Sequence, residues 1–292
     1  MDTMLNFFRK PLREGRAGLK LALIVLLGVA GGVAHAELKP QWELGAGVGG
    51  VSFPWYRGAT EYKSYVLPVP YGQYRGEILQ VDRDRMRGML FRHDKVELDV
   101  SLGGSLPVKS SDVAARVGMP DLDATLEMGP EARIHLYYDE RRYTNLDLRL
   151  PVRAVYAVNW TRFEHQGWLF HPRLSLSLRN VAQSPWSMSM SAALLYGDQG
   201  YNAYFYDVAP QYASSARAAY ASTGGYAGNQ FMWGVGRRLG DTRLGAFVKW
   251  DDLNGAVFAD SPLVTRKQQF TVGFVVAWVF WKSEKMIEVS DD

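Results

Sequence analysis

Polar and apolar positions alternate over long stretches of this chain, most clearly near its end, at Gln268–Trp281. Every second residue from Phe270 to Phe280 is large and apolar, and the residues between them are smaller. Side chains of a strand point alternately to opposite sides of a sheet. The stretch therefore predicts a strand with one face made for apolar surroundings.

The same two-residue period returns along the chain, with turn residues between the alternating stretches. These stretches begin near Trp42, Val96, Leu126, Leu146, Phe170, Met188 and Leu244, and most carry charged residues or serines on the face opposite the apolar one. Such charges are costly in a dry sandwich core but tolerated in a hydrated interior whose outer face meets lipid. The pattern predicts an all-β fold, a transmembrane antiparallel up-and-down β-barrel; a soluble sheet with a packed interior is the alternative.

The links between these stretches are of two kinds. Short polar links occur at Gly72–Gly76, Arg92–Lys95, Asp139–Arg142, Asn180–Pro185 and Leu239–Thr242, and longer ones at Pro54–Tyr62, Pro107–Leu122, Trp160–Gln166, Gln199–Ser222 and Asn254–Arg266. Bacterial barrels have short periplasmic turns, long outer loops and even strand numbers. The two kinds alternate if residues 77–91 form a hairpin that turns near Asp82–Arg85. This predicts twelve strands with both termini periplasmic, and ten strands is the alternative.

The first 36 residues predict a secretory signal peptide. Five basic residues between Arg9 and Lys20 precede the apolar run Leu21–Ala30, and Ala34-His35-Ala36 provides a cleavage site with small residues. The apolar run is about half the roughly 20 residues that a membrane-spanning helix needs. We expect residues 37–281 to form the barrel and residues 282–292 to form a polar periplasmic tail.

Removal of the predicted signal peptide changes the charge of the protein. That segment holds five of the 33 Lys and Arg residues and two of the 30 Asp and Glu residues, which leaves 28 of each in the mature chain. A neutral chain has no electrostatic support for nucleic-acid binding. The absence of any other long apolar run excludes a helical membrane protein, and the chain has no Cys to form disulfides.

Charged residues of both signs share the predicted interior face. They are Glu127, Glu131, Arg133, Arg149, Arg153, Arg173, Lys249 and Asp251. A network of cross-strand ion pairs that braces the barrel wall is the favoured interpretation. The alternative is a charged constriction that filters small solutes.

The sequence provides little support for catalysis. His171 shares a face with Ser175 and Ser177, as a catalytic pair would, but no orienting carboxylate or oxyanion donor can be placed beside them. The histidines are scattered and their spacing does not suggest a metal site. We expect no enzyme activity, no cofactor and no metal. The long loop Tyr201–Tyr226, rich in Tyr and Ala, predicts either adaptable surface contacts or a lid over the barrel mouth.

Several segments of the loops resemble the MipA/OmpV family of outer-membrane proteins. The similarity lies in Pro54-Trp55-Tyr56-Arg57-Gly58 with Tyr62 and Leu67-Pro68-Val69-Pro70, in Leu122-Asp123-Ala124 to Gly129, in Tyr204 to Gln211 with Pro210 and the later Gly224-Gly225, and in Asp260-Ser261-Pro262-Leu263-Val264. Met119-Pro120 stands where a glycine pair is more usual, and Tyr206 replaces a glycine. The family normally ends at a terminal aromatic residue, so the tail after Trp281 is a departure.

The resemblance implies an outer-membrane barrel in a Gram-negative cell. For the name-giving member it implies a non-catalytic adaptor that joins a murein transglycosylase and a murein synthase. The motif residues are those expected of turns, loops and aromatic belts, so the resemblance gives them architectural roles. Three functions follow as hypotheses: a scaffold for murein enzymes, a narrow diffusion channel, and an adhesin that acts through its outer loops.

Overall fold

The computed structural model describes residues 37–292 except 76–78, 83–84, 89–90, 94, 140–143, 182–183 and 290–292. The predicted signal peptide, residues 1–36, therefore lies outside the described residues. The described residues lie in one compact unit. None of the helices in the described part is both long and apolar enough to cross a bilayer.

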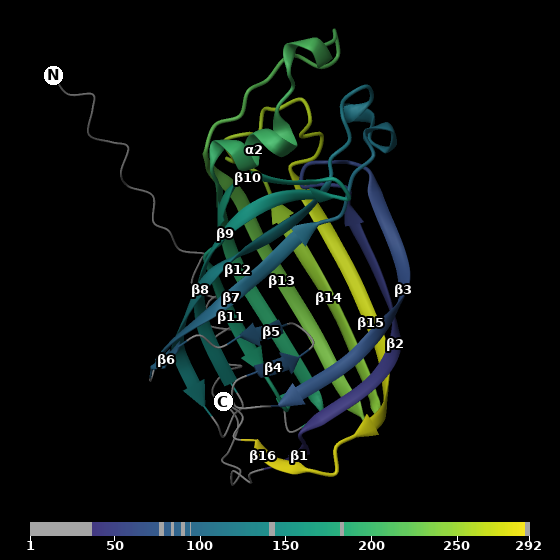
Figure 1. Ribbon diagram of the computed structural model, residues 1–292, viewed down its shortest axis with the longest axis vertical. Helices are drawn as coiled ribbons and strands as arrows, with labels where there is room; N and C mark the ends of the chain where they lie inside the picture. Colours follow the sequence, from purple (N-terminus) through teal and green to yellow (C-terminus); the bar gives the residue numbers. More distant parts are fainter. Residues whose placement is uncertain are drawn as a thin grey trace, which may run out of the picture. The chain divides into compact units, whose positions relative to one another are not determined.

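The compact unit is almost entirely an antiparallel sheet that curls round on itself (Figure 1). Its strands are β2 (Trp42–Pro54), β3 (Tyr62–Arg75), β4 (Leu79–Asp82), β5 (Arg85–Gly88), β6 (Phe91–His93), β7 (Val96–Ser105), β8 (Ala124–Asp139), β9 (Thr144–Asn159), β10 (Arg162–Phe170), β11 (Arg173–Leu178), β12 (Trp186–Gly197), β13 (Gly225–Leu239), β14 (Thr242–Asp252) and β15 (Gln268–Lys282). The last of these strands, β15, pairs with the first, β2. The predicted antiparallel barrel architecture is confirmed.

The ends of the hydrogen-bonded path bear on the strand count. Within the described residues the path runs from β5 through β2 and β15 to β6. The expected hairpin near Asp82–Arg85 is present, because these two residues pair where β4 and β5 meet. Strands β5 and β6 are separated in sequence only by residues 89 and 90, which are not described, so the count of twelve stays a prediction.

Strands β10 and β11 occupy one position in the sheet. Both pair with β9 on one side and with β12 on the other, and they are separated only by His171 and Pro172. Proline has no backbone N–H to donate to a neighbouring strand. The interruption therefore lies at the residue that cannot continue the ladder.

Two links differ from the sequence prediction. The expected long link Trp160–Gln166 is wrong, because β9 and β10 pair up to Asn159 and Arg162 and leave a tight turn. The expected link Gly72–Gly76 begins too early, because β3 continues to Arg75. In both cases pairing with a neighbouring strand extends residues whose own sequence favours a turn.

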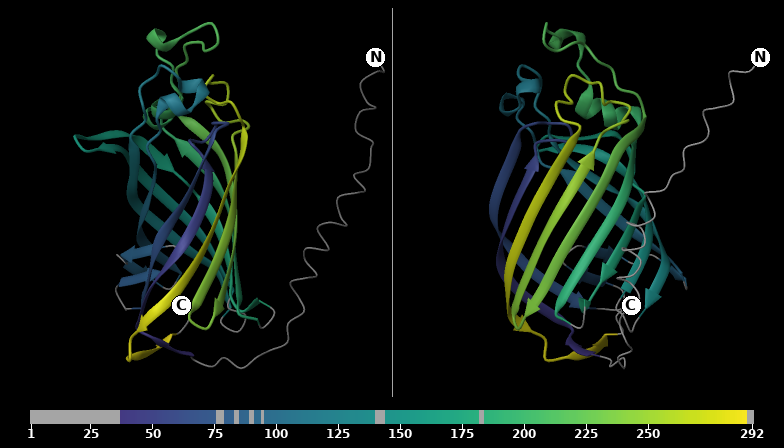
Figure 2. Two further views of the ribbon diagram at one scale, coloured as in Figure 1. Left: turned by 90° about the vertical axis from the view of Figure 1, so that its right-hand side faces the viewer. Right: turned by 180° about the vertical axis from the view of Figure 1, so that it is seen from behind.

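The tail after Trp281 also contains structure. Strand β15 continues through Lys282, and β16 (Met286–Val289) pairs with β1 (Glu37–Pro40) in a separate two-stranded sheet. This sheet lies at the end of the barrel where the short links are, beside the beginning of β2 (Figure 2). The two described ends of the chain are thus joined to each other.

The outer and inner faces of the sheet follow the predicted alternation. On β15, Phe270, Phe274 and Phe280 are 54–61% exposed, whereas Ala277 and Val279 on the other face are 1% and 5% exposed. Large exposed apolar side chains at every second position suit contact with acyl chains. The aromatic face of β15 is therefore the outer face, as predicted.

Candidate functional site

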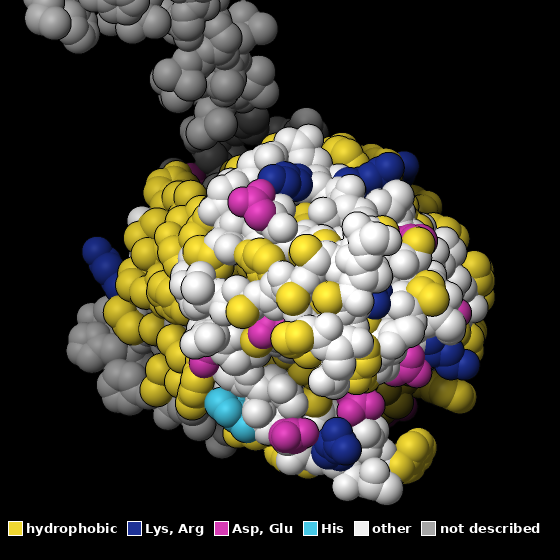
Figure 3. All heavy atoms as spheres, turned by 90° about the horizontal axis from the view of Figure 1, so that it is seen from above, with side chains coloured by type: hydrophobic (Ala, Val, Ile, Leu, Met, Phe, Trp, Pro, Cys, Tyr) yellow, Lys and Arg dark blue, Asp and Glu magenta, His cyan; other side chains and the backbone are white. Residues whose placement is uncertain are grey.

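The loop end of the sheet is covered by four segments that we call the cap. It consists of residues 55–61, 106–123, 198–224 and 253–267, and includes helix α2 (Gln199–Tyr206) and the short helices η1 (Ser110–Asp112), η2 (Ala114–Arg116) and η4 (Pro210–Tyr212). Seen from above, atoms of the protein cover that end of the molecule (Figure 3). In the loop Tyr201–Tyr226, residues 201–208 pack into the cap as a lid would, whereas most of residues 209–219 are exposed, so surface contacts stay a prediction for that part.

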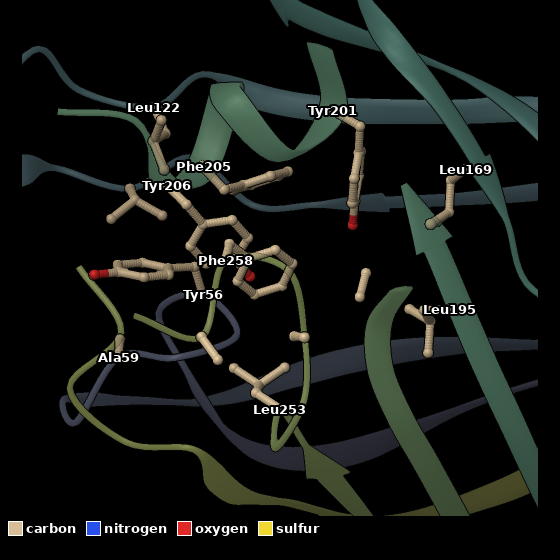
Figure 4. Packing of buried hydrophobic residues seen from close by; sticks show 14 of the residues in the cluster. Tyr56, Ala59, Leu122, Leu169, Leu195, Tyr201, Phe205, Tyr206, Leu253 and Phe258 are labelled. Atoms are coloured by element: carbon tan, nitrogen blue, oxygen red, sulfur yellow. The ribbon is translucent and has the colours of Figure 1, made fainter. Parts of the chain in front are cut away.

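The main hydrophobic core of the described residues lies inside this cap (Figure 4). Each of the four segments contributes to it: Tyr56 and Ala59; Val108, Val113 and Leu122; Tyr201, Phe205 and Tyr206; Leu253, Ala256, Phe258 and Ala259. The rings of Tyr206 and Phe258 stack with centroids 3.7 Å apart. Leu253 and Phe258 are fully buried. A soluble protein has its hydrophobic core between layers of secondary structure, whereas the main core described here lies over the mouth of the barrel.

Hydrogen bonds between the segments fix the cap. The hydroxyl of Tyr56 donates to the carbonyl of Leu263 over 2.7 Å, and that of Tyr206 donates to the carbonyl of Arg57 over 2.8 Å. Ser261 Oγ donates to the carbonyl of Tyr206 over 2.7 Å. Burial raises the pKa of both tyrosines above the ordinary value, so they remain neutral donors at physiological pH.

Helix α2 begins at a site that requires glycine nearby. The Asp198 side chain caps the helix by accepting from the backbone N–H of Tyr201 over 2.8 Å. Gly167 of β10 lies against the Asp198 side chain with φ 143°, and a Cβ there would come within 2.1 Å of Asp198 Oδ1. A glycine at position 167 therefore allows the start of α2 to approach the barrel wall.

One residue of the cap extends into the interior of the barrel. Arg57 donates through Nε to Asp251 Oδ1 on β14 over 2.9 Å and through Nη1 to the carbonyl of Ala227 on β13. Asp251 also accepts from Gln230 and lies 3.4 Å from the Lys249 ammonium. Asp251 is 1% exposed. We call this group the latch, because it ties the cap to the wall.

A second charged group lies on the inner wall from β7 to β11, and we call it the wall cluster. Its ion pairs join Arg133 to Glu97 and Asp99, Arg149 and Arg173 to Glu131, and Arg153 to Glu127, at 2.8–3.4 Å. A hydrogen bond of 2.8 Å joins His135 Nδ1 to Asp147 Oδ1. Arg133, Arg149 and Glu131 are at most 4% exposed. Such buried pairs brace the wall, at a large cost of desolvation.

A third group lies nearer the other end of the interior. Arg243 on β14 donates to Glu43 on β2 over 3.1 Å, and the Tyr71 hydroxyl of β3 donates to the same carboxylate. All three side chains are buried. The interior is thus polar along its length, as the alternation predicted.

All eight residues predicted as interior charges take part in these groups. Lys249 and Asp251 belong to the latch, and Glu127, Glu131, Arg133, Arg149, Arg153 and Arg173 belong to the wall cluster. Glu97, Asp99 and Asp147 were not among the eight, although they share the same alternating phase. Alternation along a strand could not have identified Arg57 as an interior residue, because Arg57 lies in a loop, where side chains do not alternate between two faces.

The motif residues of the resemblance lie mostly in or beside the cap. The first cap segment holds Tyr56 and Gly58, and Pro54 and Tyr62 flank it. The second holds Asp123, the third Pro210 and Gly224, and the fourth Asp260, Ser261 and Pro262. Pro68 and Pro70 lie within β3. Gly58 has φ 112° and donates to Gln269 Oε1 over 3.0 Å. These positions fit the architectural roles that the resemblance implies.

The catalytic and metal alternatives can be compared with this geometry. Nε2 of His171 has no hydrogen-bond partner in the described part of the chain, so no serine is activated through that nitrogen. No cluster of three metal-ligating His, Asp or Glu side chains occurs among the residues that the structure describes.

A cleft of about 300 Å³ opens on the cap between Arg116, Asp123, Glu164 and Tyr204.

A curled antiparallel sheet with an apolar outer face and a charged, capped interior defines an outer-membrane β-barrel protein. The sequence profile described as "MltA-interacting protein MipA" matches residues 46–280, and the chain belongs to this family. The family and the fold point to the outer membrane as its location.

Comparisons with other proteins add little. A search of curated proteins found no match. Among solved structures, a bacterial polysaccharide outer membrane secretin has 8% identity and a TM-score of 0.39, with 82% of this chain and 99% of that one covered. The toluene transporter TbuX of Ralstonia pickettii has 9% identity and a TM-score of 0.25, with coverages of 85% and 71%. These likenesses are too weak to transfer a function.

Proposed function

We propose that this chain is a non-enzymatic outer-membrane scaffold that holds a murein transglycosylase and a murein synthase together on the periplasmic side. The observation that carries the proposal is the sealed loop end of the barrel. A conduit needs a continuous path, and Leu253, Phe258 and Leu263 lie fully buried across the cap. A barrel whose loop end is covered by a packed cap suits a protein that positions partners rather than one that passes solutes.

The opposite end of the barrel offers the surface for such partners. Short turns and the β1–β16 sheet lie there, and this sheet is fixed to the barrel by hydrogen bonds from Gln41 to Lys285 and from Ser283 to Trp42. Met286 is 48% exposed on it. With both termini periplasmic, this surface faces the peptidoglycan. The family description, MltA-interacting protein, names a protein–protein interaction and so supports a partner-binding role.

The test is site-directed photo-crosslinking in whole cells. A photoreactive residue at Met286 should capture a transglycosylase or a murein synthase, whereas the same residue at Val117, 57% exposed on the cap, should not. Deletion of residues 283–292 spares Lys282 of β15, and should abolish co-purification of the murein enzymes with the detergent-solubilised protein while leaving barrel assembly intact. Capture of no murein enzyme from Met286, with the barrel assembled, would refute the scaffold.

Adhesion through the outer loops is the second candidate, and the cleft on the cap favours it. Removal of residues 199–222 cannot test it, because Tyr201, Phe205 and Tyr206 belong to the core. Shortening residues 213–219 is the better variant, because most of these residues are exposed and follow η4. Adhesion predicts weaker attachment of cells that carry the shortened loop, and unchanged attachment would exclude this part of the surface.

A further inference from the structure

Three arginines stand side by side on neighbouring strands of the inner wall. Arg133 on β8 pairs in register with Arg149 on β9, and Arg149 pairs in register with Arg173 on β11. Like charges directly opposite each other in a sheet are destabilising. Three adjacent arginines therefore need more nearby carboxylates to offset their repulsion than a single arginine elsewhere on the wall does.

The carboxylates around the row are unevenly shared. Arg133 has two of them, whereas Arg149 and Arg173 reach the same one, Glu131, at 3.4 and 3.3 Å. The next carboxylate oxygen near Arg149 is Asp147 Oδ2, which lies 3.8 Å from Nη2 and is too far for a hydrogen bond. Two guanidinium groups thus depend mainly on one acceptor group.

Several buried nitrogen atoms on this side of the row lack a hydrogen-bond partner. In the described part of the chain, Nε and Nη2 of Arg149, Nε of Arg173 and Nε2 of His171 have no hydrogen-bond partner. Arg149 is 4% and His171 7% exposed, and His171 lies in the electrostatic field of Arg153 and Arg173. Buried donors in native proteins are nearly always satisfied, so these groups call for a ligand or ordered water.

The interior beside the row is accessible to solvent. Small side chains face inward on β11 and β12, at Ser175, Ser177, Ser187, Ser189 and Ser191. Met232, paired in register with Ser191, is 37% exposed, and the Arg173 side chain is 26% exposed although it points inward. Water therefore reaches Arg173 from inside the barrel, past a wall of hydroxyl groups.

We propose that Arg149, Arg173 and His171 form an interior binding site for a small oxyanion, a phosphate or a carboxylate. A guanidinium group presents parallel N–H donors that match the oxygen atoms of both groups. The anion supplies the negative charge that Glu131 alone does not provide and accepts from the unpartnered donors. The cap closes the loop end, so the anion enters from the end with the short turns. This site is independent of any scaffold role.

The test is isothermal titration calorimetry of the detergent-solubilised full mature chain with inorganic phosphate and, separately, with succinate. Three variants are compared: Arg173→Gln, His171→Gln and, as a matched control, Arg243→Gln, which removes a buried interior arginine from the Glu43 pair. Heat-dependent mobility on gels verifies that each variant has folded. Arg173→Lys retains the charge and removes the paired donors.

We expect at least one of the two anions to bind the native chain, and Arg173→Gln to weaken that binding about tenfold or more, as the loss of a charge-assisted hydrogen bond predicts. His171→Gln and Arg173→Lys should weaken it to a smaller extent, and Arg243→Gln should bind as the native chain does. The anion that binds more tightly identifies the class of ligand. Absence of binding by both anions, or equal weakening in Arg243→Gln, would overturn the proposal.

Discussion

Nε of Arg57 lies 2.9 Å from Oδ1 of Asp251, so a loop near the start of the chain is fixed to a strand 194 residues further on. The arginine comes from the cap and the aspartate from the inner wall. Asp251 is nearly inaccessible to solvent. The cap is therefore held by a buried charge pair as well as by its own apolar core.

Removal of this pair should destabilise the protein strongly. Arg57→Ala leaves Asp251 buried with only Lys249 as a charged partner, and breaking a buried pair costs about 3–5 kcal/mol. The free energy of unfolding in urea, measured in detergent micelles, checks this. Arg162→Ala is the control, because its pair with Glu164 spans 4.0 Å and is exposed, and its loss should change stability by less than about 1 kcal/mol. Equal effects of the two substitutions would show that the latch adds nothing.

The core of the cap can be tested with two phenylalanines. Phe258→Ala removes a fully buried ring that stacks on Tyr206, and should lower the free energy of unfolding by about 3–5 kcal/mol. Phe280→Ala removes a ring that is 61% exposed on the outer face and should have a much smaller effect in micelles. A larger loss for Phe280 would mean that the outer face, rather than the cap, provides the stabilising core.

Glu131 should be the most sensitive carboxylate of the wall cluster. Glu131→Gln leaves Arg149 and Arg173 without their shared counter-charge and should destabilise the barrel by about 3–5 kcal/mol. The double variant Glu131→Gln with Arg173→Gln should regain part of that loss, because it removes one of the uncompensated charges. Strictly additive losses in the two single and the double variants would contradict this coupling.

The cap should lose stability at alkaline pH. Burial raises the pKa of Tyr204 from 10.0 to about 12, and it raises the pKa of Tyr56, Tyr201 and Tyr206 still further. A raised pKa means that the folded state favours the neutral tyrosine. The Tyr204 contribution is therefore complete below pH 10 and is lost as the pH rises from 10 to about 12.

Unfolding in urea at a series of pH values, with tyrosine ionisation followed by ultraviolet difference spectroscopy, measures this loss. Tyr204→Phe retains the ring and removes the ionisable hydroxyl, so its stability should fall less steeply over the same range. A native stability that stays constant between pH 10 and pH 12 would show that the cap tyrosines ionise without any effect on folding.

The barrel could be predicted from the sequence because period-two alternation is a local property. The alternation in Gln268–Trp281 or around Arg149 is enough to assign the inner and outer faces. The cap could not be predicted in the same way, because Tyr56, Phe205 and Phe258 lie in loops without a period and meet only in the folded chain. For the same reason the sequence indicated interior charges but not Arg57, which comes from a loop.

The pairing of β15 with β2 also determines when the sheet of this protein can be assembled. Synthesis and export begin at one end of the chain, yet the strand that joins the two sides of the sheet is among the last to arrive. A truncated product that ends before Gln268 leaves β2 and β14 with bare edges, which can pair with strands of other chains. An unfinished chain therefore differs from a finished one by two open strand edges.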